Sequence, residues 1–230
     1  MKRHYYFGWF NNTMPKNVGA MINQDLVSKE SLVMISTVPS EHEYNDKFSK
    51  GVKESWFDFA GVHFEKYHCI DYRMTKGIAQ ELLRNASAIL LHGGLSDSLK
   101  HFVEEYEMSK AIEESNATVV MGASAGGMNL SAKFAYKNEI YDGLYFDTFA
   151  FMPHAASSVE ELKDNEEIQT LIPLSKEIPV YAGCEESVIR VENGNIEILG
   201  DVYLITDGEI RKMPESDFKE ENGNDYCKNV

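Results

Sequence analysis

The stretch of sequence that decides the fold is Thr118-Val119-Val120-Met121-Gly122-Ala123-Ser124-Ala125-Gly126-Gly127-Met128-Asn129. It reads as an apolar strand, a G-x-S-x-G turn and the start of a helix. A nucleophile elbow has this composition, because its serine occupies a strained turn and small neighbours let strand and helix approach closely. We therefore expect Ser124 to present its hydroxyl at a helix N-terminus, where free N–H groups favour developing negative charge.

Two other interpretations of the same turn need weighing. In the simpler one, Ser124 only caps the helix that follows a glycine-rich turn. A phosphate-binding loop is less favoured, because no Lys-Ser or Lys-Thr pair follows Gly127 and the pattern G-x-G-x-x-G is absent.

Short apolar runs alternate with amphipathic segments on both sides of this turn. The alternation predicts an α/β fold, in which a mostly parallel sheet has helices on both faces. Strands are expected over 5–7, 32–36, 62–67, 88–91, 118–121 and 180–182, and helices over 46–59, 75–84 and 96–114. The pair Asn193-Gly194 predicts a hairpin between 187–191 and 195–199. We expect a single domain over 1–213 and a polar, acidic tail over 214–230.

Charge and composition limit which binding partners and cofactors we expect for this chain. The 230-residue chain has 22 Lys+Arg against 37 Asp+Glu, a formal net charge of -15 that opposes binding to nucleic acid or anionic lipid. No apolar run approaches the roughly 20 residues that span a bilayer, and the first residues lack the apolar segment of a secretory leader. Cys69, Cys184 and Cys227 are too scattered for a zinc site or a disulfide framework. A soluble, cytoplasmic protein without a metal or organic cofactor is expected.

A serine nucleophile needs a neighbouring base, so we searched the seven histidines. His154 follows Phe151-Met152-Pro153 and precedes a capping box that starts a helix, which puts it on a loop where catalytic groups often lie. His92, at the end of an apolar strand, is the main rival. The other five are more typical of surface or core positions: His4, His42, His63, His68 and His101.

A third residue, a carboxylate, should orient the histidine. Glu139 lies 15 residues after Ser124 and 15 before His154, which gives the order Ser, acid, His. Asp142 and Asp147 are close enough in sequence to compete.

At this point the residues resemble the peptidase E family of serine peptidases, which includes aspartyl dipeptidases and, more distantly, cyanophycinases. The family's fold is like that of class I glutamine amidotransferases. The resemblance rests on Ile89-Leu90-Leu91-His92-Gly93-Gly94, Gly122-Ala123-Ser124-Ala125-Gly126, Asn138-Glu139, Met152-Pro153-His154 and Arg190-Val191-Glu192-Asn193-Gly194.

The resemblance implies a role for each site residue. Ser124 would be the nucleophile, His154 the general base and acid, and Glu139 the orienting acid. The backbone N–H groups of Gly94 and Ala125 would form the oxyanion hole, a usual source of transition-state stabilisation.

The chain also departs from the family's pattern. Leu95 and Ser96 stand where relatives commonly continue with Asn and Thr, and the segment 159–170 lacks the arginine of the aspartyl dipeptidases. Binding of a substrate aspartate needs a cation. Arg190, Lys133 and Lys137 are the remaining candidates.

The function expected from the sequence is therefore a serine peptidase that hydrolyses short peptides, with a dipeptidase as one option. Two alternatives stay open: a non-catalytic small-molecule-binding protein of the same fold, and an esterase of the α/β-hydrolase type. The expected partners are a small peptide substrate and, as an option, further copies of the chain.

Overall fold

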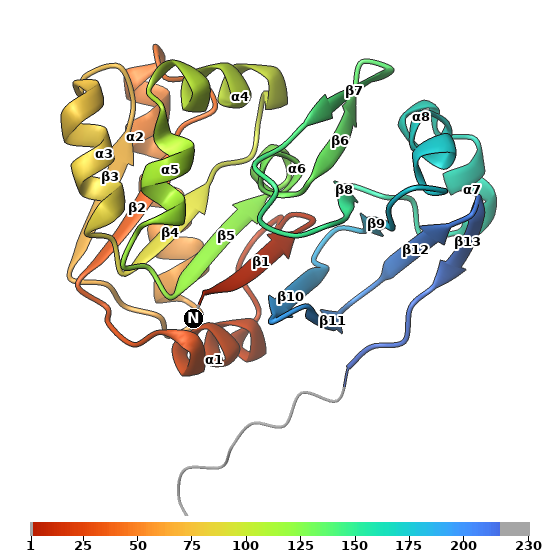
Figure 1. The fold of residues 1–230 in the computed structure, drawn as a ribbon. Coiled ribbons are helices and arrows are strands. Elements are labelled where there is room, and N and C mark those ends of the chain that lie inside the picture. Colours follow the sequence, from red (N-terminus) through yellow and green to blue (C-terminus); the bar gives the residue numbers. More distant parts are fainter. Residues whose placement is uncertain (1, 217–230) are drawn as a thin grey trace, which may run out of the picture.

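The computed structural model describes residues 2–216, and the expected tail beyond residue 216 lies outside them. Two sheets stand side by side in Figure 1. The first contains seven strands: β1 (Arg3–Phe7), β2 (Ser31–Ile35), β3 (Lys66–Ile70), β4 (Ala88–Leu91), β5 (Val119–Ala123), β10 (Val188–Glu192) and β11 (Asn195–Leu199). Their order is β11-β10-β1-β5-β4-β2-β3, and the run from β1 to β3 is parallel throughout. The hairpin β10–β11 adds two antiparallel strands beside β1.

The second sheet has six strands in the order β13-β12-β9-β8-β6-β7. They are β6 (Lys133–Tyr136), β7 (Glu139–Asp142), β8 (Ala150–Met152), β9 (Val180–Gly183), β12 (Val202–Thr206) and β13 (Glu209–Lys212). The pairs β6–β8 and β8–β9 are parallel, and the outer pairs are antiparallel. The α/β prediction is confirmed, but the strands form two sheets instead of one.

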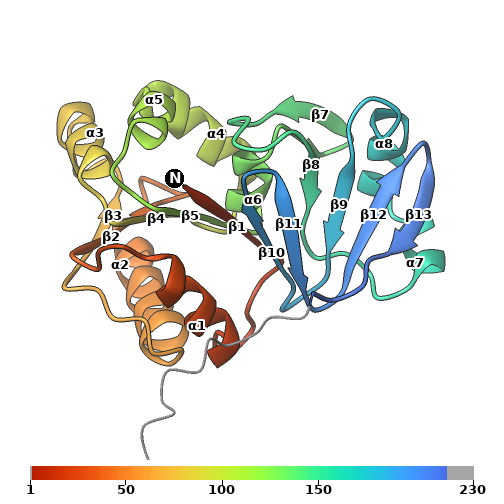
Figure 2. The same ribbon diagram turned by 60° about the horizontal axis from the view of Figure 1, so that its bottom comes forward.

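Helices cover both faces of the first sheet (Figure 2). The helices of residues 2–216 are α1 (Lys16–Asp25), α2 (His42–Gly51), the π-helical segment η1 (Val52–Asp58), α3 (Lys76–Arg84), α4 (Ser96–Glu105), α5 (Met108–Glu113), α6 (Ala125–Leu130), α7 (Val159–Lys163) and α8 (Glu166–Leu174), of which α7 and α8 lie on the second sheet. Among the described residues, no helix has both the length and the apolar character needed to cross a membrane.

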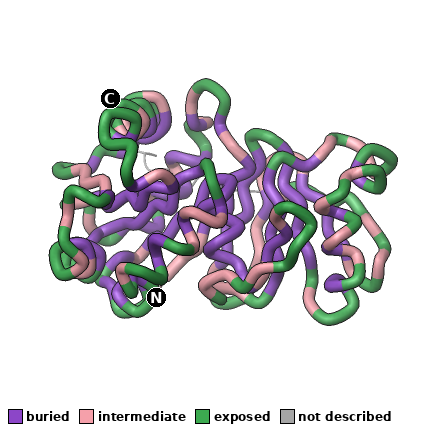
Figure 3. Tube along the Cα trace, turned by 90° about the horizontal axis from the view of Figure 1, so that it is seen from above, coloured by how far each residue is buried: buried purple, intermediate pink, exposed green. Residues whose placement is uncertain are grey.

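The apolar residues form three packed clusters. Strand residues that point to one face of the first sheet pack against α3, α4 and α5, while those on the other face pack against α1 and η1. The second sheet packs one face against α7 and α8. Its other face joins the core of the first sheet, where Tyr6 lies 4.9 Å from Phe149 and 5.4 Å from Phe151 between ring centres. The buried strands therefore run through the middle of the molecule, with exposed loops around them (Figure 3).

Several expected boundaries were wrong, each for a physical reason. The third strand lies at β3 and not over 62–67, because Val62 and Phe64 are buried in a loop and so imitate a strand. The helix expected over 96–114 is broken into α4 and α5 by Glu107, whose backbone is left-handed (φ 48°). The helix expected over 46–59 begins at His42 and becomes π-helical from Val52.

The second half of the chain also holds the expected hairpin. Asn193 and Gly194 both have positive φ (54° and 77°), as a two-residue hairpin turn requires. Beyond β13, Ser216 donates its N–H to the Ile198 carbonyl and accepts from the Ile198 N–H, so the start of the expected tail is held against β11.

Candidate active site

Ser124 occupies the expected elbow between β5 and α6. Strand β5 ends at Ala123 and α6 begins at Ala125, so one residue makes the whole turn. Its backbone is strained for a residue with a side chain (φ 48°, ψ -113°), and its N–H donates to the carbonyl of Phe7 at 3.0 Å. That bond ties the elbow to the end of the neighbouring strand β1.

Glycines make this tight turn sterically feasible. A Cβ on Gly122 would lie 2.5 Å from the backbone of Gly126. A Cβ on Gly126 would lie 2.0 Å from the carbonyl oxygen of Leu91 in β4. The small residues of the G-x-S-x-G turn therefore let α6 pack directly on the strands.

His154 lies beside the serine. It follows β8 on a loop, with a left-handed backbone (φ 57°), and its Nε2 is 2.7 Å from Ser124 Oγ. The expected pair of hydroxyl and imidazole is thus brought within hydrogen-bond distance.

Glu185 supplies the carboxylate behind the histidine. It follows β9, and its Oε1 lies 2.5 Å from His154 Nδ1. An ionised carboxylate can only accept, so Nδ1 carries the proton and Nε2 is left to accept from the Ser124 hydroxyl. Asn11 donates to the other carboxylate oxygen at 3.5 Å. Ser124 is 8% exposed, whereas the side chains of His154 and Glu185 are 45% and 44% exposed. The serine hydroxyl is therefore buried, while the imidazole and the carboxylate face the solvent.

The prediction of Glu139 as the orienting acid was wrong. Glu139 begins β7, an edge strand of the second sheet, where its carboxylate accepts from the Tyr141 hydroxyl at 3.0 Å. The two competing acids are also engaged elsewhere: Asp142 with Lys133 and Tyr145, and Asp147 with His4 and Tyr6.

The sequence did contain a signal for Glu185. The apolar run 180–182 was expected to be a strand, and Glu185 follows its carboxyl end. Ser124 and His154 likewise follow the carboxyl ends of strands, which is where ligands bind in open α/β sheets. The order along the chain is Ser, His, Glu, unlike the order Ser, acid, His of α/β-hydrolases.

His92, the rival candidate for the base, makes no hydrogen bond to Ser124 among the described residues. It is 3% exposed, its ring centre lies 4.6 Å from that of Phe48, and its Nε2 has no hydrogen-bond partner among the described residues. Burial lowers its pKa to about 3, so the ring is neutral at ordinary pH.

A cavity of about 300 Å³ opens over the elbow. We call this cavity the nucleophile pocket. It is lined by Trp9, Tyr44, Phe48, Gly93, Gly94, Ser124 and His154. Gly94 has a φ of 134°, and a Cβ there would lie 2.3 Å from the Thr37 hydroxyl, so a side chain is excluded. Ala125 is the first residue of α6, where a backbone N–H lacks an intrahelical partner. Both positions suit an oxyanion hole, which stays a prediction.

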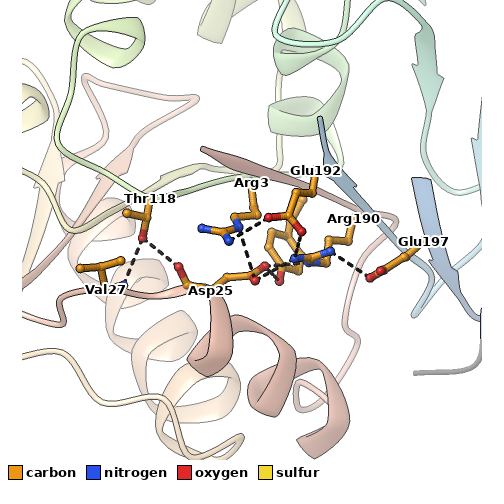
Figure 4. Close-up of polar contacts among 8 residues, drawn as sticks. Arg3, Asp25, Val27, Thr118, Arg190, Glu192 and Glu197 are labelled. Atoms are coloured by element: carbon orange, nitrogen blue, oxygen red, sulfur yellow. Dashed lines mark hydrogen bonds and ion pairs between the residues drawn. The ribbon is translucent and has the colours of Figure 1, made fainter. Parts of the chain in front are cut away.

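The three candidate cations are all paired with carboxylates. Lys133 binds Asp142 at 2.6 Å and Lys137 binds Asp97 at 3.1 Å. Arg190 binds Asp25, Glu192 and Glu197, at 2.7, 2.9 and 3.0 Å (Figure 4). None of the three lines the nucleophile pocket.

Comparisons with known proteins agree with this architecture. Peptidase E of Nostoc sp. strain PCC 7120 is 24% identical over 200 residues, which cover 80% of this chain and 78% of that protein. The crystal structure of a peptidase from an acI-B1 Actinobacterium superposes with a TM-score of 0.73 at 14% identity, over 94% of this chain and 96% of the other. A Listeria monocytogenes EGD-e protein assigned provisionally to peptidase E gives 0.63 at 19% identity, over 86% and 98%. The fold is therefore that of peptidase E structures.

The family itself is matched over most of the chain. The match covers residues 19–199, which include the elbow, His154 and Glu185. The chain thus belongs to Peptidase family S51, a family of serine peptidases.

Proposed function

We propose that this protein hydrolyses short peptides, with Ser124 as nucleophile, His154 as general base and acid, and Glu185 as the orienting acid. The observation that carries the proposal is the unbroken run of contacts from Ser124 Oγ to His154 Nε2 and from His154 Nδ1 to Glu185. Because each donor in this run has one acceptor, the proton of the serine has a defined path to the imidazole.

The chemistry follows from that path. Ser124 Oγ attacks the peptide carbonyl while His154 takes the hydroxyl proton, and the tetrahedral oxyanion forms near the N–H groups of Gly94 and Ala125. His154 then gives the proton to the leaving amine as the C–N bond breaks. Water attacks the acyl-enzyme with the same histidine as base, which releases the acid and restores Ser124.

Turnover of dipeptides tests the proposal. A library with a varied first residue should be hydrolysed by the parent, and Ser124→Ala should lose that activity by at least about 10³-fold. The p-nitrophenyl esters of simple acids, assayed in parallel, separate a peptidase from an esterase. A folded parent that cleaves no peptide would contradict the proposal, and binding of a small molecule without turnover would favour a non-catalytic role.

A further inference from the structure

A second cavity adjoins the nucleophile pocket. It encloses about 340 Å³ and shares Trp9, Tyr44 and Phe48 with that pocket, then extends to Phe10 and Trp56. We call it the aromatic cavity. A group held at Ser124 therefore lies next to the aromatic cavity, across side chains that line both.

The walls of the aromatic cavity are fixed by ring packing. The rings of Trp9 and Trp56 meet edge to face with centres 5.0 Å apart, and those of Tyr44 and Phe48 stack at 5.7 Å. Trp9 also packs on the glycine turn, since a Cβ on Gly93 would lie 2.5 Å from its ring. The aromatic wall thus reaches the turn that carries Gly94, next to the reacting carbonyl.

Charge is sparse around both cavities. Among the described residues that line the aromatic cavity, Lys47 alone is charged, and it is exposed to solvent. The part of the chain that the structure describes contributes no lysine or arginine to the lining of the nucleophile pocket. A substrate carboxylate would lose hydration here without a buried cation in return, whereas a large apolar side chain gains by burial against aromatic rings.

From the shared aromatic lining and the scarcity of charge we infer that the substrate carries an aromatic or long aliphatic side chain in the residue next to the scissile bond. That side chain occupies the aromatic cavity while its peptide carbonyl lies at Ser124. The inference rests on the peptidase function proposed above and assigns its substrate class, which differs from an aspartate preference.

A substitution at Gly51 tests whether the aromatic cavity binds the substrate side chain. It lines the aromatic cavity at the end of α2, has a helical backbone (φ -59°), and a Cβ there would meet no atom within 4 Å. Gly51→Phe therefore adds an aromatic ring to the lining of the cavity without backbone strain, and we expect that ring to compete with a substrate side chain for the space. Gly77→Phe is the matched control, because Gly77 also lies in a helix, α3, with open space around its Cβ, and lines neither cavity.

The experiment compares kcat/KM for Phe-Ala, Ala-Phe, Leu-Ala, Ala-Leu, Asp-Ala, Ala-Asp and Ala-Ala. Phe-Ala or Leu-Ala should exceed Ala-Ala by about 10- to 100-fold in the parent. Gly51→Phe should remove most of that advantage, while Gly77→Phe leaves it unchanged.

Each other outcome has a definite meaning. A preference for Asp-Ala, Ala-Asp, Ala-Phe or Ala-Leu, or a preference for Phe-Ala or Leu-Ala that Gly51→Phe leaves intact, overturns the substrate assignment alone. A folded parent that hydrolyses none of the peptides overturns the proposed function, and the substrate class with it.

Discussion

At the residue scale, the proposed role of Glu185 is to orient His154. Its carboxylate accepts from Nδ1, and an amide in its place could donate to that nitrogen and favour the wrong tautomer. We expect Glu185→Gln to lower kcat by about 10²- to 10⁴-fold with little change in KM. Steady-state assays on a dipeptide measure this. Glu139→Gln is the control and should stay within about two-fold of the parent, since Glu139 bonds to Tyr141. Equal losses in both variants would contradict the assignment.

A second residue, His92, makes stability depend on pH. Burial lowers its pKa from 6.5 to about 3, so below pH 6.5 the unfolded chain binds a proton there that the folded chain does not. The free energy of unfolding should therefore fall as the pH drops from about 6.5 toward 3. Relative to His92→Gln, the parent should lose about 2–3 kcal/mol between pH 7 and pH 4. Urea unfolding at several pH values measures the difference, and parallel curves for the two proteins would contradict it.

How far the site could be predicted from sequence also depends on single residues. Ser124 and His154 were found because each lies in a local pattern, an elbow and a loop before a capping box. Ser158 does cap α7, accepting from the Glu161 N–H. Glu185 was missed because a carboxylate among 37 acids has no local pattern of its own. Its role depends on which strand ends lie side by side, and that is a property of the sheet.

At the element scale, the close approach of α6 to β4 holds the elbow. Gly126→Ala would place a Cβ 2.0 Å from the Leu91 carbonyl oxygen, so α6 must shift and carry Ser124 with it. We expect a loss of about 1–3 kcal/mol in the free energy of unfolding, and a larger relative loss of kcat/KM, at least about 100-fold. Unfolding and peptide turnover are measured on the same preparation.

Gly77→Ala provides the control for that substitution. It lies in α3 with no atom within 4 Å of its Cβ, so alanine should stabilise the helix by about 0.5–1 kcal/mol and leave turnover unchanged. If Gly126→Ala kept full activity, the elbow would not depend on close packing.

The elements of the first sheet could largely be predicted, whereas of the strands in the second sheet only β9 was expected. Strands β4 and β9 are short apolar runs, which the sequence shows directly. Strand β7 is exposed on an edge and has no alternating apolar pattern. The turn between β6 and β7 uses Lys137 and Asn138 at positive φ (51° and 62°), without the glycine that marks such turns. Membership of one sheet or the other is set by contacts between distant segments, which local periodicity does not record.

At the scale of the whole molecule, a buried ion cluster joins distant segments. Arg190 in β10 binds Asp25 at the end of α1, 165 residues away, and Tyr5 donates to the same carboxylate at 2.5 Å. Asp25 is 5% exposed and the Arg190 side chain 10% exposed. Such a pair has no sequence signature, because any arginine and aspartate could form it. The sequence suggested Arg190 as a substrate ligand; the structure gives it this internal role.

Arg190→Met tests that role. It would leave Asp25 buried without its main partner, and we expect the free energy of unfolding to fall by about 3–5 kcal/mol. Turnover at a temperature where the variant is folded should stay within a few-fold of the parent. Adding Asp25→Asn should recover part of the loss, because the unpaired charge is then removed. A specific loss of substrate affinity with unchanged stability would contradict the structural role.

The central claim is that Ser124 is an activated nucleophile. A fluorophosphonate probe, followed by mass spectrometry of the digested protein, tests it most directly. The account predicts one adduct, on Ser124, in the folded parent, no adduct in Ser124→Ala, and much slower labelling in His154→Ala. A folded parent that stays unlabelled, or that carries its adduct on a different residue, would contradict it.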